Sequence, residues 1–270
     1  MSSDEPTMAD RLALVGGADD VFVSASPTEP GHVFGGLLIG QALRAGQLTV
    51  PDLDGVRPVH VLHASFVTAG RGNEVVHYDV ERTRDGGSFT TRRVVARQQH
   101  GVVLVMTADF HADEPGLDYE TPPTPGIPAP ESLAPGRYAS RWFDARDVPV
   151  DAVAGRLPHG RRAWYHPNAP VPDDPLLQLQ CLAYLSDHGP TRAARQPHVD
   201  LADDARRQSV SLDHSVWFHR PVDVNDWLLS ELIPVATGRG RGLSLGTIRT
   251  AEGSLLATVA QAVLLRQRPA

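Results

Sequence analysis

The pattern of hydrophobic positions predicts one buried helix over residues 175–187. This segment leaves almost no polar stripe, which is typical of a helix surrounded by other elements. Asp174 can cap its start, its first residue is a proline, and Gly189-Pro190 provide a stop. The segment ends at Asp187, where the helix dipole makes a carboxylate cost roughly 0.3–1 kcal/mol. This unfavourable position indicates a functional reason for Asp187.

A second helix is predicted over residues 31–46, and it is rich in glycine. Gly35, Gly36 and Gly40 would each cost up to about 1 kcal/mol in a helix. We therefore expect another part of the chain to approach the helix backbone closely at these positions.

Alternating patterns and turn signals predict strands in both halves of the chain. The predicted strand regions are residues 21–26, residues 59–111 with turns at 84–88 and 99–101, residues 138–143, and residues 209–266. A loop is expected between the third of these regions and the helix at 175–187. Residues 113–136 contain seven prolines, a density that predicts a linker without regular structure.

Two pairs of residues indicate an internal duplication. Phe66 and Phe218 lie 152 residues apart, as do Gly101 and Gly253, and each glycine lies between the last two predicted strands of its half. We therefore predict an α+β fold of two tandem units, each with one long helix wrapped by a curved antiparallel sheet, with the sheets joined and a site shared between the units. The predicted boundaries are residues 1–112 for the N-terminal unit, 113–136 for the Pro-rich linker, and 137–270 for the C-terminal unit that carries the catalytic residues.

Composition narrows the function classes. The chain has 270 residues and a net charge of −7, which gives no general case for binding nucleic acid or an anionic membrane. All 25 basic residues are arginine, so Schiff-base chemistry and a phosphate-loop NTPase are excluded, while arginines remain for phosphate recognition. Cys181 is the single cysteine, which excludes an intramolecular disulfide and a cysteine-based zinc site. No apolar run is long enough for a membrane span, and the first residues lack signal-peptide features, so we expect a soluble, cytoplasmic protein.

Two motifs with possible chemistry are set aside. Residues 242–246 match the nucleophile-elbow pattern around Ser244, but no histidine follows His219 and the residues after the serine favour a strand. The histidine pairs 60/63 and 214/219 would point to opposite faces of strands, so we expect no metal site and interpret these histidines as packed or solvent-facing.

Three polar residues remain as candidates. Asp187 ends the buried helix, although a surface carboxylate at a helix end is the ordinary interpretation. Gln261 lies in a strand pattern on the same face as several apolar residues, where a buried amide either pairs with a neighbouring backbone group or holds a reacting water. Ser211 lies on a strand that enters the same half and carries no signal by itself.

Six segments in order along residues 20–266 resemble the TesB-like acyl-CoA thioesterase II family. They are Phe34-Gly-Gly-Leu-Leu-Ile-Gly-Gln-Ala-Leu, Val61-Leu-His-Ala-Ser-Phe, Arg84-Asp-Gly-Gly-Ser-Phe, Leu182-Ala-Tyr-Leu-Ser-Asp-His, Ser211-Leu-Asp-His-Ser-Val-Trp-Phe-His-Arg-Pro and Gly240-Arg-Gly-Leu. The resemblance implies a double hotdog fold and hydrolysis of fatty acyl-CoA to acid and CoA, hence a thioesterase of lipid metabolism. It also implies catalytic roles for Asp187, Ser211 and Gln261, which together orient a water.

The resemblance and the physical argument lead to one interpretation of the site. Asp187 is the general base or water-orienting carboxylate, assisted by Ser211 and Gln261, and the N–H groups of Gly35 and Gly36 at a helix start polarise the thioester carbonyl. No metal and no cofactor are expected, the partner is the acyl-CoA substrate, and a homo-oligomer of double hotdog protomers is expected.

The sequence departs from the family after its glutamine. The family usually continues with Glu-Gly, whereas this chain has Ala262-Val263, and the hydroxyl position has serine instead of the commoner threonine. This departure leaves a catalytically degenerate acyl-CoA binding protein as one alternative. The other is an acyl-CoA hydratase or dehydratase of the same fold, whose usual Asp/His motif is not found around either predicted helix.

Overall fold

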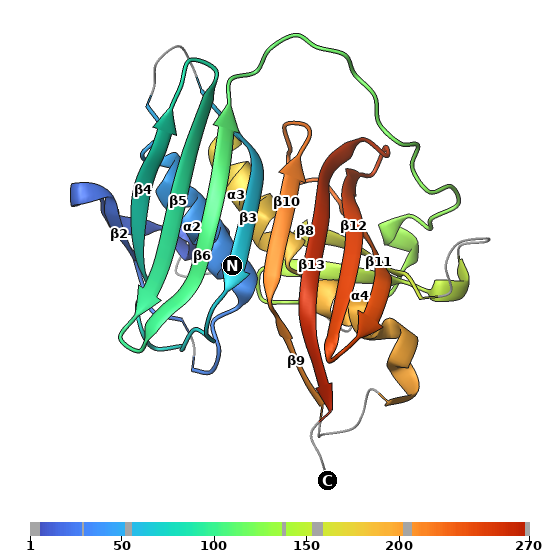
Figure 1. The fold of residues 1–270 in the computed structure, drawn as a ribbon. Helices are drawn as coiled ribbons and strands as arrows, with labels where there is room; N and C mark the ends of the chain where they lie inside the picture. The colour runs from blue at the N-terminus through green and yellow to red at the C-terminus, as the bar shows by residue number, and fades with distance from the viewer. Residues whose placement is uncertain are drawn as a thin grey trace. The chain divides into compact units, whose positions relative to one another are not determined.

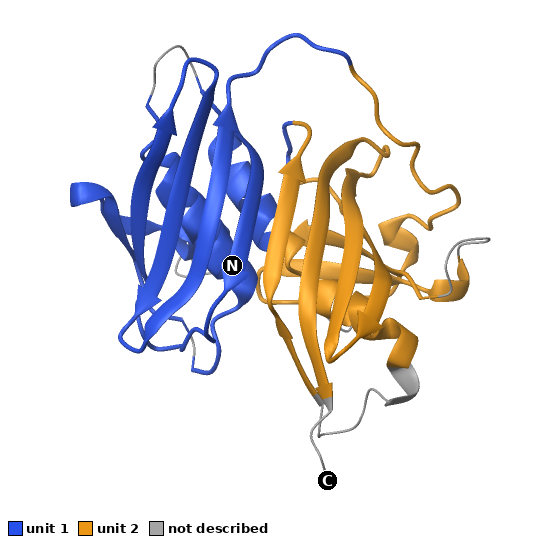
Figure 2. Cartoon of the chain, viewed as in Figure 1, with its two compact units in different colours: residues 1–117, 169–185, 221–223 blue, residues 118–168, 186–220, 224–270 orange. Residues whose placement is uncertain are grey.

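The structure is a computed structural model that describes residues 6–28, 30–51, 56–136, 139–152, 159–201 and 207–267 (Figure 1). The chain forms two compact units, which Figure 2 shows in different colours. Unit 1 comprises residues 1–117, 169–185 and 221–223, and unit 2 comprises residues 118–168, 186–220 and 224–270.

Unit 1 is an antiparallel sheet with a long helix packed against it. Its strands follow the order β1-β2-β4-β5-β6-β3. The glycine-rich helix α2 contacts β3, β4, β5 and β6, and its buried residues, such as Leu37 and Ile39, fill the space above the sheet. The elements are α1 (Met8–Leu12), β1 (Leu14–Gly16), η1 (Ala18–Asp20), β2 (Val21–Ser24), α2 (Gly35–Gln47), β3 (Val59–Phe66), β4 (His77–Asp85), β5 (Phe89–Gln98) and β6 (Gly101–His111).

Helix α3 (Pro175–Ser186) lies against α2, and glycine allows the two to approach closely. A Cβ at Gly36 would clash with the carbonyl oxygen of Tyr184, and a Cβ at Gly40 would lie 3.2 Å from the carbonyl oxygen of Gln180. The ring of Phe34 packs edge-on against the ring of Tyr184, with centroids 5.1 Å apart. The predicted close approach is therefore confirmed at Gly36 and Gly40.

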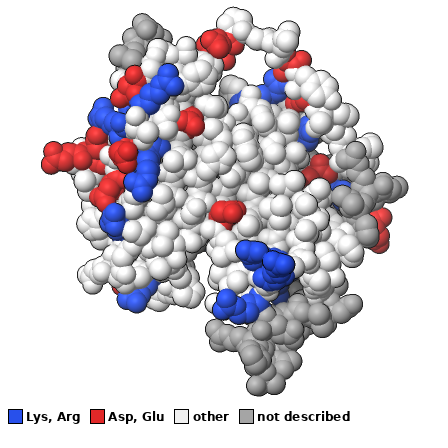
Figure 3. All heavy atoms as spheres, viewed as in Figure 1, with Lys and Arg blue, Asp and Glu red and all other residues white. Residues whose placement is uncertain are grey.

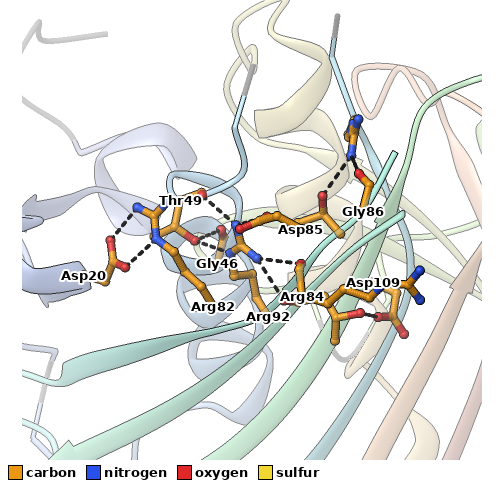
Figure 4. Close-up of polar contacts among 12 residues, drawn as sticks. Asp20, Gly46, Thr49, Arg82, Arg84, Asp85, Gly86, Arg92 and Asp109 are labelled. Atoms are coloured by element: carbon orange, nitrogen blue, oxygen red, sulfur yellow. Dashed lines mark hydrogen bonds and ion pairs between the residues drawn. The ribbon is translucent and has the colours of Figure 1, made fainter. Parts of the chain in front are cut away.

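A polar network in unit 1 holds the β4–β5 hairpin to the end of α2 (Figure 4). Arg92 on β5 is fully buried, and its Nε donates to Thr49 Oγ1 at 2.7 Å just beyond α2. Its Nη2 donates to Asp85 Oδ1 at 2.6 Å, and its Nη1 donates to the carbonyl oxygen of Arg84 at 3.1 Å. A buried guanidinium is tolerated only with its donors paired, and these three bonds, with two more to the carbonyl oxygens of Thr49 and Thr91, pair all five.

Unit 2 repeats the sheet order of unit 1. Its strands follow the order β7-β8-β11-β12-β13-β10, with β9 paired to β13. Each strand of this order corresponds to the strand at the same place in the order of unit 1. Helix α4 contacts β11, β12 and β13. The elements are η2 (Pro130–Ser132), β7 (Phe143–Val148), η3 (Val150–Ala152), β8 (Arg161–Pro167), α4 (Pro190–Arg195), η4 (Gln196–Leu201), β9 (Arg207–Ser211), β10 (Asp213–Phe218), β11 (Leu228–Gly238), β12 (Arg241–Thr250) and β13 (Leu255–Gln267).

Some predicted elements are wrong in position. The strand predicted over 138–143 is found at Phe143–Val148, and residues 137–138 lie outside the described residues. The predicted loop before α3 contains strand β8, whose Arg161 and Arg162 are buried because Asp147 and Glu231 pair with them. Gly189-Pro190, interpreted as a stop, also begins helix α4, since proline suits the first helical position.

The predicted division of the chain into folding units stays a prediction. Residues 169–185, which include most of α3, belong to unit 1 by their contacts even though they follow the Pro-rich segment. That segment contains the short helix η2, and its Thr121 and Glu120 accept hydrogen bonds from Arg249 and from the backbone of Leu255.

Candidate active site

A buried polar cluster surrounds Gln261 on β13 of unit 2. The side chain of Gln261 is 1% exposed. Its Nε2 donates to Ser211 Oγ at 2.7 Å and to Thr191 Oγ1 at 3.3 Å. Ser211 is opposite Val263 in the β9–β13 register, so Ser211 and Gln261 extend from the same face of the sheet. The structure therefore brings two of the three predicted catalytic residues into direct contact.

His214 on β10 completes the hydrogen bonds of Gln261. Its ring is fully buried, its Nδ1 lies 2.5 Å from Gln261 Oε1, and its Nε2 lies 2.8 Å from Ser186 Oγ. An amide oxygen only accepts, so Nδ1 carries the hydrogen and Nε2 accepts from the Ser186 hydroxyl. Burial lowers the pKa of His214 to about 4, which keeps the ring neutral near neutral pH.

Asp187 directly follows Ser186, the last residue of α3, and is 9% exposed. Two residues that flank Asp187 in the sequence belong to the cluster. Ser186, before it, bonds His214, and Thr191, after it, bonds Gln261. Consecutive Cα atoms are about 3.8 Å apart, so the Asp187 backbone lies beside the cluster. Burial lowers the pKa of the next residue, His188, to about 4, which keeps that ring neutral as well.

Ser244 is not the nucleophile of an elbow. It lies within strand β12, directly opposite Gln261, instead of on a strand-to-helix turn. The residue is 1% exposed, and among the described residues its Oγ has no hydrogen-bond partner. The structure thus agrees with the exclusion of a serine triad and adds a buried hydroxyl to the cluster.

Gly35 and Gly36 open helix α2 in unit 1. Phe34 caps the helix without a side-chain hydrogen bond, so the N–H groups of the two glycines belong to a first turn that has no acceptor within the helix. The position that a Cβ would take at Gly36 is filled by the carbonyl oxygen of Tyr184. The predicted role of these N–H groups toward a carbonyl stays a prediction.

Neither a metal site nor a membrane helix is found in the described part of the chain. No group of three or more His, Cys, Asp or Glu residues in these ranges could hold a metal ion. None of the helices in the described ranges has both the length and the hydropathy that a membrane span needs.

Comparison with known proteins decides the family. A family model described as acyl-CoA thioesterase matches residues 136–264, and one described as acyl-CoA thioesterase N-terminal domain matches residues 24–111. Acyl-CoA thioesterase 2 from Haemophilus influenzae is 32% identical over an alignment of 256 residues that covers 87% of this chain and 88% of that protein. The chain belongs to the acyl-CoA thioesterase family.

Solved structures agree with this thioesterase assignment. An acyl-CoA thioesterase II, TesB2, from Mycobacterium marinum is 34% identical, with a TM-score of 0.85 over 97% of this chain and 99% of that chain. A protein with a hot dog fold from Alicyclobacillus acidocaldarius is 19% identical, with a TM-score of 0.78 over 97% and 98% of the two chains, which shows the fold alone. The predicted TesB-like family and double hotdog fold are confirmed, and the chain is a thioester hydrolase.

The sequence interpretation missed His214. His214, Val216 and Phe218 alternate on β10 and are all buried, whereas His219 just beyond the strand is exposed. A histidine in phase with apolar residues on a strand is expected to need partners within the core. This period-two signal could have placed His214 in the cluster from the sequence.

Proposed function

We propose that this thioesterase hydrolyses acyl-CoA to a free acid and CoA with a water that Asp187 activates and Ser211 and Gln261 orient. Family membership supports the reaction, and one observation carries the mechanism. That observation is the hydrogen bond from Gln261 Nε2 to Ser211 Oγ, beside the helix end from which Asp187 follows.

The order of hydrogen bonds supports a role for Ser211 as a donor. Ser186 donates to His214, His214 donates to Gln261, and Gln261 donates to the Ser211 oxygen. Since the Ser211 oxygen accepts from the amide, its own hydrogen can point to the water or to the substrate. In this proposal His214 is a positioning residue that fixes which way the Gln261 amide faces.

Each step of the proposed reaction balances. Asp187 takes a proton from the water while the water oxygen forms a bond to the thioester carbonyl carbon, giving a tetrahedral oxyanion. The N–H groups of Gly35 and Gly36 are proposed to stabilise that oxyanion. When the carbon–sulfur bond breaks, the proton on Asp187 passes to the leaving CoA sulfur, and the acid and the free carboxylate of Asp187 result.

The buried hydroxyl of Ser244 supports the binding of a water or a substrate atom in the cluster. Leaving the Ser244 hydroxyl without a partner costs roughly 1–3 kcal/mol, a cost that a water or a substrate atom bound there would offset. Ala262 faces away from Gln261 and donates its N–H to Asp213, whereas Val263 is fully buried. The departure from the family therefore affects two residues beside Gln261 whose side chains take no part in the hydrogen bonds of the cluster.

Release of free thiol from acyl-CoAs of graded chain length tests the reaction. Asp187→Asn should lower kcat by on the order of 10²-fold or more with little change in KM, because it removes the proton acceptor and keeps the shape. Ser211→Ala and Gln261→Ala should each lower kcat less, and their effects should not add to that of Asp187→Asn. The control is Asp173→Asn, an exposed carboxylate before α3, which should leave kcat unchanged.

Two outcomes would replace the proposal. Turnover of enoyl-CoA without thiol release would favour the hydratase, and tight binding of acyl-CoA without either reaction would favour a degenerate binding protein. If Asp187→Asn keeps most of its kcat, or an acyl-enzyme is trapped, the water mechanism is wrong and Ser244 returns as a candidate.

We also propose a role in fatty acid metabolism, a cytoplasmic location and a homo-oligomeric state. The acyl-CoA thioesterase family supports the first, and the composition of the chain is the argument for the second. Cell fractionation and light scattering of the purified chain test the location and the oligomeric state.

A further inference from the structure

The side chain of Gln261 has two amide hydrogens, and the structure gives each of them an acceptor. One is donated to Ser211 Oγ at 2.7 Å, and the other is donated to Thr191 Oγ1 at 3.3 Å. The amide oxygen lies 2.5 Å from His214 Nδ1. Because no amide hydrogen is left for the reacting water, Gln261 acts on that water through the hydroxyl groups that it holds.

Thr191 lies in the first turn of α4, and close contacts fix this helix on the sheet of unit 2. Gly189, with a φ of 114°, turns the chain into the helix, and its carbonyl oxygen accepts from two N–H groups of α4 at 2.9 and 2.8 Å. A Cβ at Gly242 on β12 would lie only 3.2 Å from the Cβ of the fully buried Ala194. The Thr191 hydroxyl is therefore presented to Gln261 by a helix that packs directly on the sheet.

Two acceptors together fix the direction of the Gln261 amide. The last torsion of a glutamine side chain has only a broad preference, so hydrogen bonds decide where the amide hydrogens point. Both hydrogens lie in the plane of the amide group, and neither can change its acceptor without turning the other. With Thr191 in place, the amide faces Ser211, and the hydrogen of Ser211 is left to point to the water.

Ser244 offers the same amide a competing acceptor. It lies directly opposite Gln261 in the β12–β13 register, so both side chains extend from one face, with Cβ atoms about 4.5–5.5 Å apart. Its hydroxyl is buried and has no hydrogen-bond partner within the described ranges. Without an acceptor at Thr191, the amide could turn toward Ser244 and withdraw its other hydrogen from Ser211.

We propose that Thr191 is a positioning residue for thioester hydrolysis, which holds the Gln261 amide so that the Ser211 hydroxyl faces the reacting water. This inference rests on the roles proposed above for Ser211 and Gln261. Because Thr191 acts through Gln261, its loss should slow the reaction and leave substrate binding unchanged.

Three variants test the proposal by thiol release from an acyl-CoA. Thr191→Val keeps the shape of the side chain and removes the acceptor. Its kcat should fall about three- to tenfold, the scale of one hydrogen bond between neutral groups, with KM within about twofold. Thr191→Ser retains the hydroxyl and should restore kcat to within about twofold of the unaltered chain. In Gln261→Ala, the further change Thr191→Val should lower kcat no more, because the residue through which Thr191 acts is gone.

The matched control is Thr258→Val, which should leave kcat and KM unchanged. Thr258 is also partly buried, and its Oγ1 lies 2.9 Å from a ring nitrogen of His219. It lies three residues before Gln261 on β13, so its side chain extends from the opposite face of the sheet. The sheet of unit 2 lies in front of α4 in Figure 1, and Figure 3 shows few charged side chains over the middle of this outer face.

Magnetic resonance separates this inference from the proposed reaction. In protein with isotope-labelled glutamine, the pair of side-chain amide signals that Gln261→Ala removes belongs to Gln261. Thr191→Val should shift this pair and speed its hydrogen exchange with water, and Thr258→Val should do neither.

Three outcomes would overturn the inference. The first is an unchanged pair of amide signals in Thr191→Val, and the second is a loss of kcat in Thr191→Ser as large as in Thr191→Val. The third is an undiminished kcat in Thr191→Val when Gln261→Ala has lost activity. Full kcat in Gln261→Ala would instead refute the proposed site, and this role with it, even if the signals shift.

Discussion

Acid should destabilise this protein through His214. The ring is fully buried, and burial lowers its pKa to about 4, against 6.5 for a histidine in water. Between these two pH values the unfolded chain binds a proton at His214 that the folded chain does not bind. The free energy of unfolding is therefore fully retained above pH 6.5 and falls as the pH is lowered toward 4.

The size of the effect follows from the pKa difference. Each pH unit between the two pKa values is worth about 1.4 kcal/mol, so the window of His214 amounts to about 3 kcal/mol. Burial also lowers the pKa of His188 to about 4, but this residue is partly exposed as a whole and should contribute less. Because a domain is typically stable by only about 5–15 kcal/mol, the loss should be large enough to measure.

Urea unfolding at several pH values between 4.5 and 7.5 would measure it. The variant His214→Asn keeps an N–H donor near the position of Nδ1 and cannot titrate. The free energy of unfolding of the unaltered chain should fall more steeply with acid than that of the variant, by up to about 1.4 kcal/mol per pH unit. If the two curves run parallel across this range, His214 is not buried in its neutral form and the hydrogen-bond order assigned to the cluster is wrong.

Three further predictions concern packing, the buried arginine and metals. Gly36→Ala should lower the free energy of unfolding by about 2–3 kcal/mol, because its Cβ clashes with the Tyr184 carbonyl, whereas Gly87→Ala, with open space around it, should change it little; thermal unfolding compares them. Arg92→Met should lower it by about 2–4 kcal/mol, because Thr49 and Asp85 lose their donor, whereas Arg93→Met on the exposed face should cost under about 1 kcal/mol in urea unfolding. Thiol release should survive a strong chelator, and a loss that a divalent cation restores would contradict the absence of a metal requirement.

The strongest sequence patterns predicted the fold well. The buried helix was predicted over 175–187 and is found at Pro175–Ser186, and the glycine-rich helix predicted over 31–46 is found at Gly35–Gln47. The turns predicted at 84–88 and 99–101 connect β4 to β5 and β5 to β6. These elements are specified by local features, namely apolar periodicity, capping residues and turn residues, which a single sequence contains.

Strand β8 shows what a single sequence could not specify. Its first residues, Arg161 and Arg162, are charged, and arginine in a buried strand is unexpected. Their burial depends on Asp147 and on Glu231, which is 69 residues away from Arg162. Ion pairs between distant segments allow such a strand to enter the core, and no local pattern reveals those partners.

The three proposed catalytic residues also show which parts of a site a single sequence can predict. Asp187 stands out because it breaks a local rule about helix ends, and Gln261 because it interrupts an apolar face. Ser211 carries no local signal, and its contact with Gln261 exists because β9 pairs with β13 across about 50 residues of chain. A site assembled from three elements could be predicted only in part by reasoning about each element alone.

The internal duplication offers a test of why the cluster is polar. Strands β3 and β10 both end in phenylalanine, and four residues before that end lie Leu62 in unit 1 and His214 in unit 2. Leu62 pairs with Ala108 on β6, and both are buried, whereas His214 bonds Gln261 on β13. The same sheet position is therefore filled by an apolar pair in one unit and by a polar pair in the other. Because burying polar groups costs free energy unless all are hydrogen-bonded, the fold itself does not require the polar pair. A polar pair at a position that the fold can fill with leucine and alanine is expected where the residues serve a function. Comparing the two halves of the sequence at an offset of 152 residues would have identified His214 without a structure.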